Sequence, residues 1–244
     1  MFIKIVIILL LLIVAASLLS GRSVLGARRA AGQARPSLRK LMMSVAVLLL
    51  VIGATVVTIH LSGCSKSGES AFRSTDISGA KFARLSFLDA LTDHNGRRVA
   101  SADFQGKVVI VFFGYIQCPD ICPTKMVAFQ ETMRLLGPAA DRVQVLFVTV
   151  DPERDTQVEL AAYVPWFDAR FLGLSGAPRA TREVAEEFRV IYSKVKDGTA
   201  LGYSMDHSAT SYVFDPQGRP RLLIRYGETP QSIADDVLKL LAGH

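Results

Sequence analysis

Acidic residues are absent from the first 63 positions of this 244-residue chain, although those positions carry seven lysines and arginines. The rest of the chain holds the other 21 cations and all 22 acids, so it is close to neutral. A nucleic-acid-binding domain carries a clear excess of lysine and arginine on its surface. We therefore expect no nucleic-acid partner, and we assign the basic excess to a membrane-targeting region.

Charge is sparse in the chain as a whole, and repeats are missing. Asp, Glu, Lys and Arg make up 20% of the residues, against about 25% in typical globular domains, and 50% of the residues are hydrophobic. This combination excludes an intrinsically disordered chain. The sequence has no internal repeat and no low-complexity tract. Residues 82–244 are long enough to form one domain with a sizeable core.

Two long apolar runs occupy the N-terminal region, residues 1–63. They extend from Phe2 to Leu19 and from Leu41 to Leu61, and each approaches the ~20 residues that span a bilayer. The linker 21–40 carries six cations and no acid, and the positive-inside rule places such a linker in the cytoplasm. We therefore expect a membrane-anchored protein whose globular domain faces the extracytoplasmic, periplasmic side.

The second apolar run ends in Leu61-Ser62-Gly63-Cys64, which looks like a bacterial lipobox. A basic start, an apolar stretch and small residues before the cut are typical of a secretory signal. In a lipoprotein, Cys64 would be lipidated and become the new N-terminus. The alternative is an uncleaved transmembrane anchor that ends in cysteine. Residues 64–81 are small and polar, and this composition predicts a flexible tether.

Strand and helix patterns alternate along residues 82–244. The continuous apolar run Val108–Gly114 is typical of a strand buried on both faces, and Val143–Val150 is expected to form a second buried strand. Thr156 and Glu159 fit a capping box at the start of a helix. Further strands are expected at Ser86–Leu91, Arg97–Ala100, Val190–Val195, Thr210–Phe214 and Arg221–Arg225, and further helices at Pro123–Leu136, from Pro178 and from Pro230. This order predicts an α/β sandwich with a central mixed sheet.

Two cysteines lie in the segment GYIQCPDICPTKM, directly after the first buried strand. Binding sites of such sheets lie at the carboxyl ends of parallel strands. Each cysteine precedes a proline, and residues before proline avoid the helical region. We therefore expect Cys122 to cap the following helix, with Pro123 as its first residue, and Cys118 to lie on a loop above the helix start.

A helix N-terminus stabilises a thiolate. Cys118 and Cys122 can therefore form a disulfide, exchange with another thiol pair or bind a soft metal ion. A purely structural disulfide is the alternative, but it would close a loop of only three intervening residues. Such a short loop gains little stability from a crosslink.

Two further residues lie near the expected carboxyl end of the sheet. His207 stands in Met205-Asp206-His207-Ser208, just before the expected strand at Thr210. Its ordinary interpretation is a surface histidine bonded to a backbone carbonyl. Asp151 follows the second buried strand, and we expect it to orient His207 or an amide of the cysteine loop. The alternative for Asp151 is a turn-forming role ahead of Pro152.

Three motifs closely resemble the Sco/SenC family, whose members are membrane-tethered, thioredoxin-like proteins implicated in building the copper site of cytochrome c oxidase. They are FFGYIQCPDICPTKM, TVDPERDT and DHSATSYVFDPQG, in this order. The resemblance covers essentially all of residues 82–244 and implies a thioredoxin-like fold. It also implies that Cys118, Cys122 and His207 are copper ligands. The implied partners are the copper-site subunit of cytochrome c oxidase, other copper chaperones or thiol reductants, and the membrane.

Ligand chemistry agrees with the resemblance but does not by itself select the metal. Two thiolates suit Cu(I), and an added imidazole with a water or oxygen ligand allows Cu(II). Zinc accepts the same three ligands. A thiol–disulfide oxidoreductase that uses Cys118 and Cys122 as a redox pair is the alternative function, although general oxidoreductases use a CxxC spacing. A peroxidase is disfavoured, because the threonine or serine and the proline that peroxiredoxins place before the reactive cysteine are missing.

Overall fold

The structure, a computed structural model, describes residues 42, 49, 51–53, 71–196, 198 and 202–244. Within these residues, no helix combines the length and apolar character needed to cross a bilayer. Cys64 and nearly all of both apolar runs predicted to be membrane segments lie outside the described part of the chain.

The domain is built around a mixed sheet of seven strands in the order β1-β9-β8-β3-β4-β5-β2. Strand β3 pairs in parallel with β4, and β4 pairs in parallel with β5, whereas the other neighbours are antiparallel. The strands are β1 Thr75–Asp76, β2 Thr92–Asp93, β3 Val108–Gly114, β4 Val143–Thr149, β5 Leu172–Ser175, β8 Ser211–Phe214 and β9 Pro220–Ile224. The predicted α/β fold with a central mixed sheet is confirmed.

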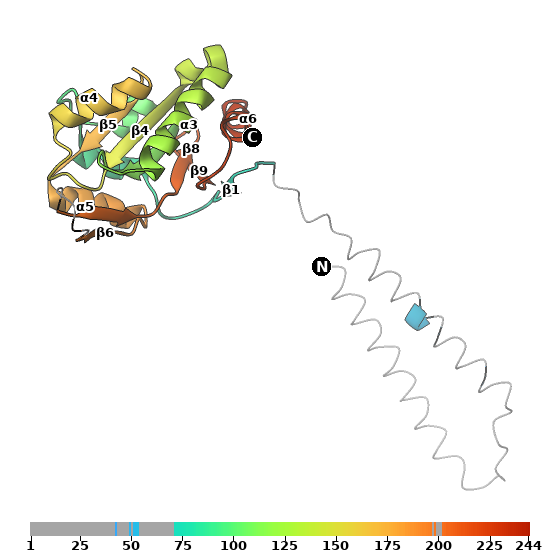
Figure 1. The fold of residues 1–244 in the computed structure, drawn as a ribbon. Helices are drawn as coiled ribbons and strands as arrows, with labels where there is room; N and C mark the ends of the chain where they lie inside the picture. Colours follow the sequence, from blue (N-terminus) through green and yellow to red (C-terminus); the bar gives the residue numbers. More distant parts are fainter. Residues whose placement is uncertain (1–41, 43–48, 50, 54–70, 197, 199–201) are drawn as a thin grey trace, which may run out of the picture. The chain divides into compact units, whose positions relative to one another are not determined.

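Helices cover both faces of this sheet, and its strands lie between α4 and α5 in Figure 1. On one face, Phe112 contacts Phe129 of α3, and Phe147 contacts Tyr163 of α4. On the other face, Phe113 contacts Phe188, which follows α5. The helices are α3 Ile121–Leu136, α4 Gln157–Phe167, α5 Pro178–Glu187 and α6 Pro230–Leu241, with 3₁₀ turns at Leu85–Ala90, Ser101–Phe104 and Gly137–Arg142.

Strands β3 and β4 form the centre of the core, as the apolar runs predicted. Every residue of both strands is buried, as expected for parallel strands covered on both faces. The predicted helix start is also confirmed, since Thr156 is the N-cap of α4 and accepts a hydrogen bond from the amide of Glu159. The reciprocal half of the capping box is replaced, because the Thr156 amide donates to the carbonyl of Arg154 and the Glu159 carboxylate contacts the Thr156 hydroxyl. Thr229 caps α6 in the same way, through the amide of Ser232. These local signals place β3, β4 and α4, and the loop that carries the candidate site begins at the carboxyl end of β3.

Several local predictions were wrong. Ser86–Leu91 lies largely in the 3₁₀ turn Leu85–Ala90 rather than in a strand. The buried residues of this 3₁₀ turn, Leu85 and Leu88, are three positions apart. This spacing matches a 3₁₀ turn and not the alternation of a strand. The strand β5 was not predicted, because its sequence LGLS is short and contains glycine.

Part of the predicted tether belongs to the fold. Thr75 and Asp76 pair with β9. Phe72 and Ser74 are buried, and the Ser74 amide donates to Asp236 of α6 over 2.7 Å. Composition alone predicted a flexible tether because this segment is small and polar. The carboxylate of Asp236 accepts a hydrogen bond from the backbone of the segment, so the segment packs against the domain despite that composition.

Candidate metal centre

The cysteine loop connects the carboxyl end of β3 to α3. Its first turn is closed by a hydrogen bond of 3.3 Å from the Cys118 amide to the Tyr115 carbonyl. The amide of Cys122 then donates to Sγ of Cys118 over 3.4 Å. Cys118 is half-buried and Cys122 is buried. The predicted position of Cys118, on a loop above the helix start, is therefore confirmed.

The helix starts two residues earlier than predicted. Asp120 is the N-cap of α3, and Ile121 is the first helical residue, so Cys122 and Pro123 both lie in the first turn. The first-turn amides of a helix have no partner within the helix, so Pro123 removes no helical hydrogen bond there. The restriction on residues before proline is a bias and not a prohibition. The amide of Cys122 remains free to bind the Cys118 sulfur.

The backbone of Gly114 lies close to the side chain of Cys122, and the lack of a side chain at Gly114 leaves space for the sulfur. A Cβ atom at Gly114 would lie 3.0 Å from Sγ of Cys122 and 2.9 Å from the Phe147 ring. Both distances are shorter than ordinary van der Waals contacts, so only glycine fits at this end of β3 without displacing the sulfur. Sequence reasoning placed Gly114 at the strand end but did not identify this role.

His207 ends the strand β7, Ser204–His207, which pairs with β6, Tyr192–Val195, in a separate two-stranded sheet. Its Nε2 lies 3.4 Å from Sγ of Cys122, and its Nδ1 lies 3.1 Å from the carbonyl oxygen of Ser208. A carbonyl only accepts hydrogen bonds, so this contact places the proton of the neutral ring on Nδ1. Nε2 is then directed to the cysteines. It donates to the Cys118 sulfur when it carries a proton, and without that proton its lone pair is available to a metal, as in a metal-binding histidine.

The three side chains form a compact group. One ligand atom from each of Cys118, Cys122 and His207 lies within 4.8 Å of the others. Metal bonds of about 2.0 to 2.3 Å place two ligands of one ion up to about 4.6 Å apart. The group therefore fits a single metal ion after a small closure. Two sulfurs and one nitrogen suit copper or zinc.

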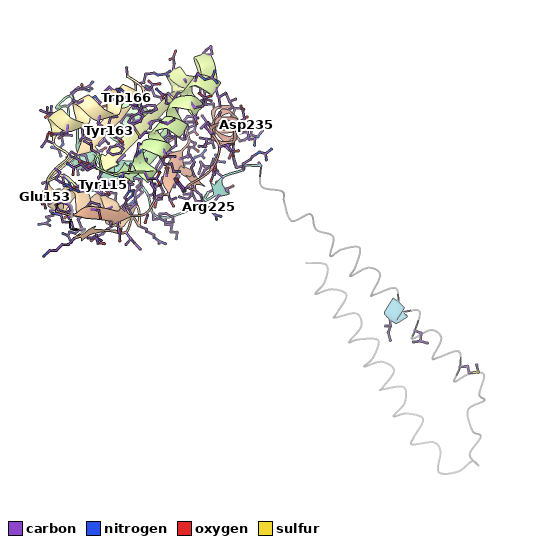
Figure 2. All side chains as sticks on the ribbon, in the orientation of Figure 1. Tyr115, Glu153, Tyr163, Trp166, Arg225 and Asp235 are labelled. Carbon is purple, nitrogen blue, oxygen red and sulfur yellow. The ribbon has the colours of Figure 1, made fainter. Side chains whose placement is uncertain are left out.

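Aromatic rings enclose His207. The centroid of the Tyr115 ring lies 5.8 Å from the imidazole centroid, and that of Phe112 lies 6.3 Å away, both edge to face. Figure 2 labels Tyr115, which lies toward the end of the domain that carries β6. The rings exclude water from one side of the imidazole and limit its movement toward the core.

The two thiols have opposite pKa shifts. A hydrogen bond from the Cys122 thiol lowers the pKa of Cys118 to about 3; His207 and the amides of Cys122 and Asp120 lower it further, whereas burial raises it. The same thiol–thiol hydrogen bond, together with burial, raises the pKa of Cys122 well above its usual range. At neutral pH the pair therefore carries one thiolate, on Cys118. Binding of a metal by both sulfurs must release the proton of Cys122.

The contacts of Asp151 differ from those predicted. Its carboxylate accepts hydrogen bonds from Arg154 and from the hydroxyl of Tyr203, 2.9 Å away. The carboxylate that holds an amide of the cysteine loop is Asp155, which accepts from the amide of Ile116 over 3.1 Å. The motif TVDPERDT contains both acids, and the turn that follows β4 decides which one faces the loop. Sequence reasoning therefore missed Asp155.

Comparisons with known proteins agree with the motifs. A family model described as SCO1/SenC matches residues 81–242. Protein SCO2 homolog, mitochondrial, of Bos taurus is 37% identical over 155 residues, 63% of this chain and 58% of that protein. SCO2-like protein RP587 of Rickettsia prowazekii is 32% identical over 173 residues, 70% of this chain and 82% of that protein.

Solved structures of related proteins share the fold. Bradyrhizobium japonicum ScoI with copper bound has a TM-score of 0.56 and 40% identity, covering 62% of this chain and 95% of that chain. Yeast Sco1 with copper bound has a TM-score of 0.57 and 28% identity, covering 63% and 86%. The chain spans little more than half the length of the Bos taurus relative. On the family match and these identities, the chain belongs to the SCO1/SenC family.

Proposed function

We propose that this chain binds copper through Cys118, Cys122 and His207 and carries it as cargo to a partner protein. The observation that carries the proposal is the convergence of two thiols and one imidazole within 4.8 Å. Two relatives with 28% and 40% identity are described as Sco proteins with copper bound. The copper-site subunit of cytochrome c oxidase is the proposed recipient, and this choice rests on the family resemblance.

The arrangement of donors suits a protein that both binds and releases copper. Cys118 is half-buried and anionic, so it can meet an incoming ion first. Cys122 is buried and protonated, and it becomes a ligand only when its proton leaves. Soft thiolates favour Cu(I), and the Nε2 of His207 supplies the nitrogen that Cu(II) prefers. Copper binding is therefore linked to release of the Cys122 proton, and a lower pH favours release of copper.

Thiol–disulfide exchange is the second candidate function, favoured by the thiolate of Cys118 beside a protonated thiol. Oxidation of the Cys118–Cys122 pair to a disulfide releases two electrons and the one proton that Cys122 carries. Together with one proton from water, these convert one partner disulfide into two thiols. This reaction could prepare the cysteines of a partner for copper. It needs both cysteines and does not need His207.

The full chain, purified in detergent and reduced before copper addition, tests the two functions. Cys118→Ser and Cys122→Ser should each abolish binding of one copper per chain, because each removes half of the thiolate pair. A cysteine variant with normal copper stoichiometry would refute copper binding at this site. If both variants lose copper but His207→Ala still supports oxidase assembly in cells, thiol exchange is the better assignment.

We further propose that residues 1–63 target the membrane, that the chain is tethered there, and that the domain lies on its extracytoplasmic side. The support is the pair of apolar runs, the basic linker and the lipobox-like end. If Cys64 is lipidated, Cys64→Ala should leave a precursor that retains the 63 preceding residues. An intact Met1 in the wild-type membrane form would favour the uncleaved anchor.

A further inference from the structure

The hairpin that carries His207 has few contacts with the rest of the domain. Strands β6 and β7 pair only with each other and not with the seven-stranded sheet. Three of the four residues of β6 are exposed, and within β7 only Met205 is buried. An isolated two-stranded hairpin is only marginally stable. The position of His207 therefore depends on the few contacts that fix this hairpin.

One side of the hairpin borders a cavity instead of packed side chains. The cavity has a volume of ≈ 550 Å³ and lies between the hairpin, α5 and the residues that follow β4. Tyr192, Lys194 and Met205 line it from the hairpin. Because a cavity offers no partner atoms, this side does not hold the hairpin in one position.

Polar contacts hold the hairpin at the start of β7, through Asp151, Arg154 and Tyr203, which we name the latch. The hydroxyl of Tyr203 donates to Asp151 over 2.9 Å, and Nη1 of Arg154 donates to the carbonyl oxygen of Tyr203 over 2.8 Å. The guanidinium carbon of Arg154 also lies 3.7 Å from the centroid of the Tyr203 ring, and its Nε donates to Asp151. The latch joins the turn after β4 to the residue that precedes β7.

The latch is better shielded from solvent than the other ionic contact of the hairpin. The side chain of Asp151 is 0% exposed and that of Arg154 is 15% exposed. Lys194 and Glu153 form the other ion pair, over 2.6 Å, with side chains 45% and 57% exposed. Exposed ion pairs contribute little. Figure 2 shows Glu153 at the same end of the domain as Tyr115.

We infer that the latch positions His207 as the third metal ligand, so that Asp151 acts on His207 through Tyr203 and not directly. Tyr203 lies four residues before His207, and Met205 anchors the strand between them. Without the latch, the hairpin is held mainly by the buried side chain of Met205 and can rotate about it. The imidazole of His207 then moves away from Cys122. This inference rests on the proposed function, because it assigns the latch a role in binding Cu(II).

Tyr203→Phe tests the latch with the loss of a single hydroxyl. In the copper-free full chain, hydrogen exchange at residues 204–207 should become about 10-fold faster. Cu(II) affinity should fall about 10-fold, a loss of about 1.4 kcal/mol, whereas Cu(I) affinity should change less than about 3-fold because both thiolates remain. Tyr226→Phe is the matched control, since Tyr226 is 51% exposed after β9, and it should change neither quantity.

Two further variants show whether the effect passes through His207. Arg154→Lys keeps a positive charge but loses the forked contacts of the guanidinium, and it should have the same effects as Tyr203→Phe. In a His207→Ala background, Tyr203→Phe should cause no further loss of Cu(II) affinity. A further loss in that background would overturn the inference.

Other outcomes are equally decisive. The inference is wrong if Tyr203→Phe matches Tyr226→Phe in both exchange and Cu(II) affinity, or if exchange accelerates while Cu(II) affinity stays the same. It is also wrong if Cu(I) and Cu(II) affinity fall together. If the wild-type chain binds no copper, the proposed function fails; faster exchange of Tyr203→Phe then still supports the latch, and unchanged exchange refutes it.

Discussion

Sγ of Cys122 lies 3.4 Å from Nε2 of His207, although 85 residues separate the two in the chain. Cys122 is fixed by the first turn of α3, whereas His207 is fixed by a hairpin outside the main sheet. The sulfur and nitrogen donors of the site therefore depend on different structural elements. Changes on the hairpin should affect the nitrogen donor alone.

The first prediction concerns the nitrogen donor. His207→Ala should retain Cu(I) but lose or greatly weaken Cu(II) binding, because two thiolates suffice for Cu(I) and Cu(II) prefers additional nitrogen or oxygen donors. The Cys118–Cys122 disulfide should still form and be reduced. Copper titrations in both oxidation states measure the effect, with His244→Ala at the exposed C-terminus as the control. Unchanged Cu(II) binding in His207→Ala would show that the third ligand is another group.

The second prediction concerns the close approach at Gly114. Gly114→Ala should displace Sγ of Cys122, reduce copper binding and lower the free energy of unfolding by about 1–3 kcal/mol, as overpacked core positions do. Gly173→Ala in β5 is a matched control, because its Cβ would lie 3.0 Å from Val164. The control should lose stability and keep normal copper stoichiometry. Equal copper binding by both variants would argue against a role for Gly114 in the site.

The third prediction concerns the order in which the thiols react. Because its pKa is lowered to about 3, Cys118 should be alkylated by iodoacetamide at pH 6 in the reduced chain, whereas the buried and protonated Cys122 should be spared. Peptide mass spectrometry distinguishes the two sites. In Cys122→Ala, the pKa of Cys118 should rise, because its main hydrogen-bond donor is lost, and alkylation at pH 6 should slow. Faster labelling of Cys122 than of Cys118 would contradict this assignment.

The fold was predictable where local sequence determines structure. Strands β3 and β4 followed from their mainly apolar sequences, because strands buried on both faces are rich in apolar residues. The α4 start followed from Thr156 and Glu159, which interact within one turn. The Leu85–Ala90 segment was not predictable in this way, because its short apolar pattern fits both a strand and a turn.

The site was predictable only in part. The spacing of Cys118 and Cys122 and the loop before α3 indicated thiol chemistry, but His207 entered through the family resemblance, because one histidine in a loop gives no local signal. Gly114 and Asp155 act through tertiary contacts, with a sulfur and an amide from other segments. Such contacts leave no periodic pattern in the sequence, so these two roles emerged only from the structure.

The last prediction concerns Asp155, a carboxyl that is 1% exposed and accepts hydrogen bonds from the hydroxyl of Thr149 over 2.6 Å and the amide of Ile116 over 3.1 Å. Burial raises its pKa to about 6, against the opposing effect of these two hydrogen bonds. An aspartate in the unfolded chain has a pKa of about 3.9. Between about pH 4 and pH 6, the folded protein therefore binds more protons than the unfolded chain.

This difference fixes the sign of the pH dependence. The contribution of Asp155 to the free energy of unfolding is greatest below about pH 4, falls as pH rises to about 6 and is constant above that, with a total loss of about 3 kcal/mol. Asp155→Asn cannot titrate, so the stability of the wild-type chain relative to this variant should fall across the same window. Urea unfolding of both proteins from pH 3.5 to 7.5 measures the difference. A difference that is constant across this range, or one that grows with pH, would show that Asp155 is ionised in the folded protein at pH 4.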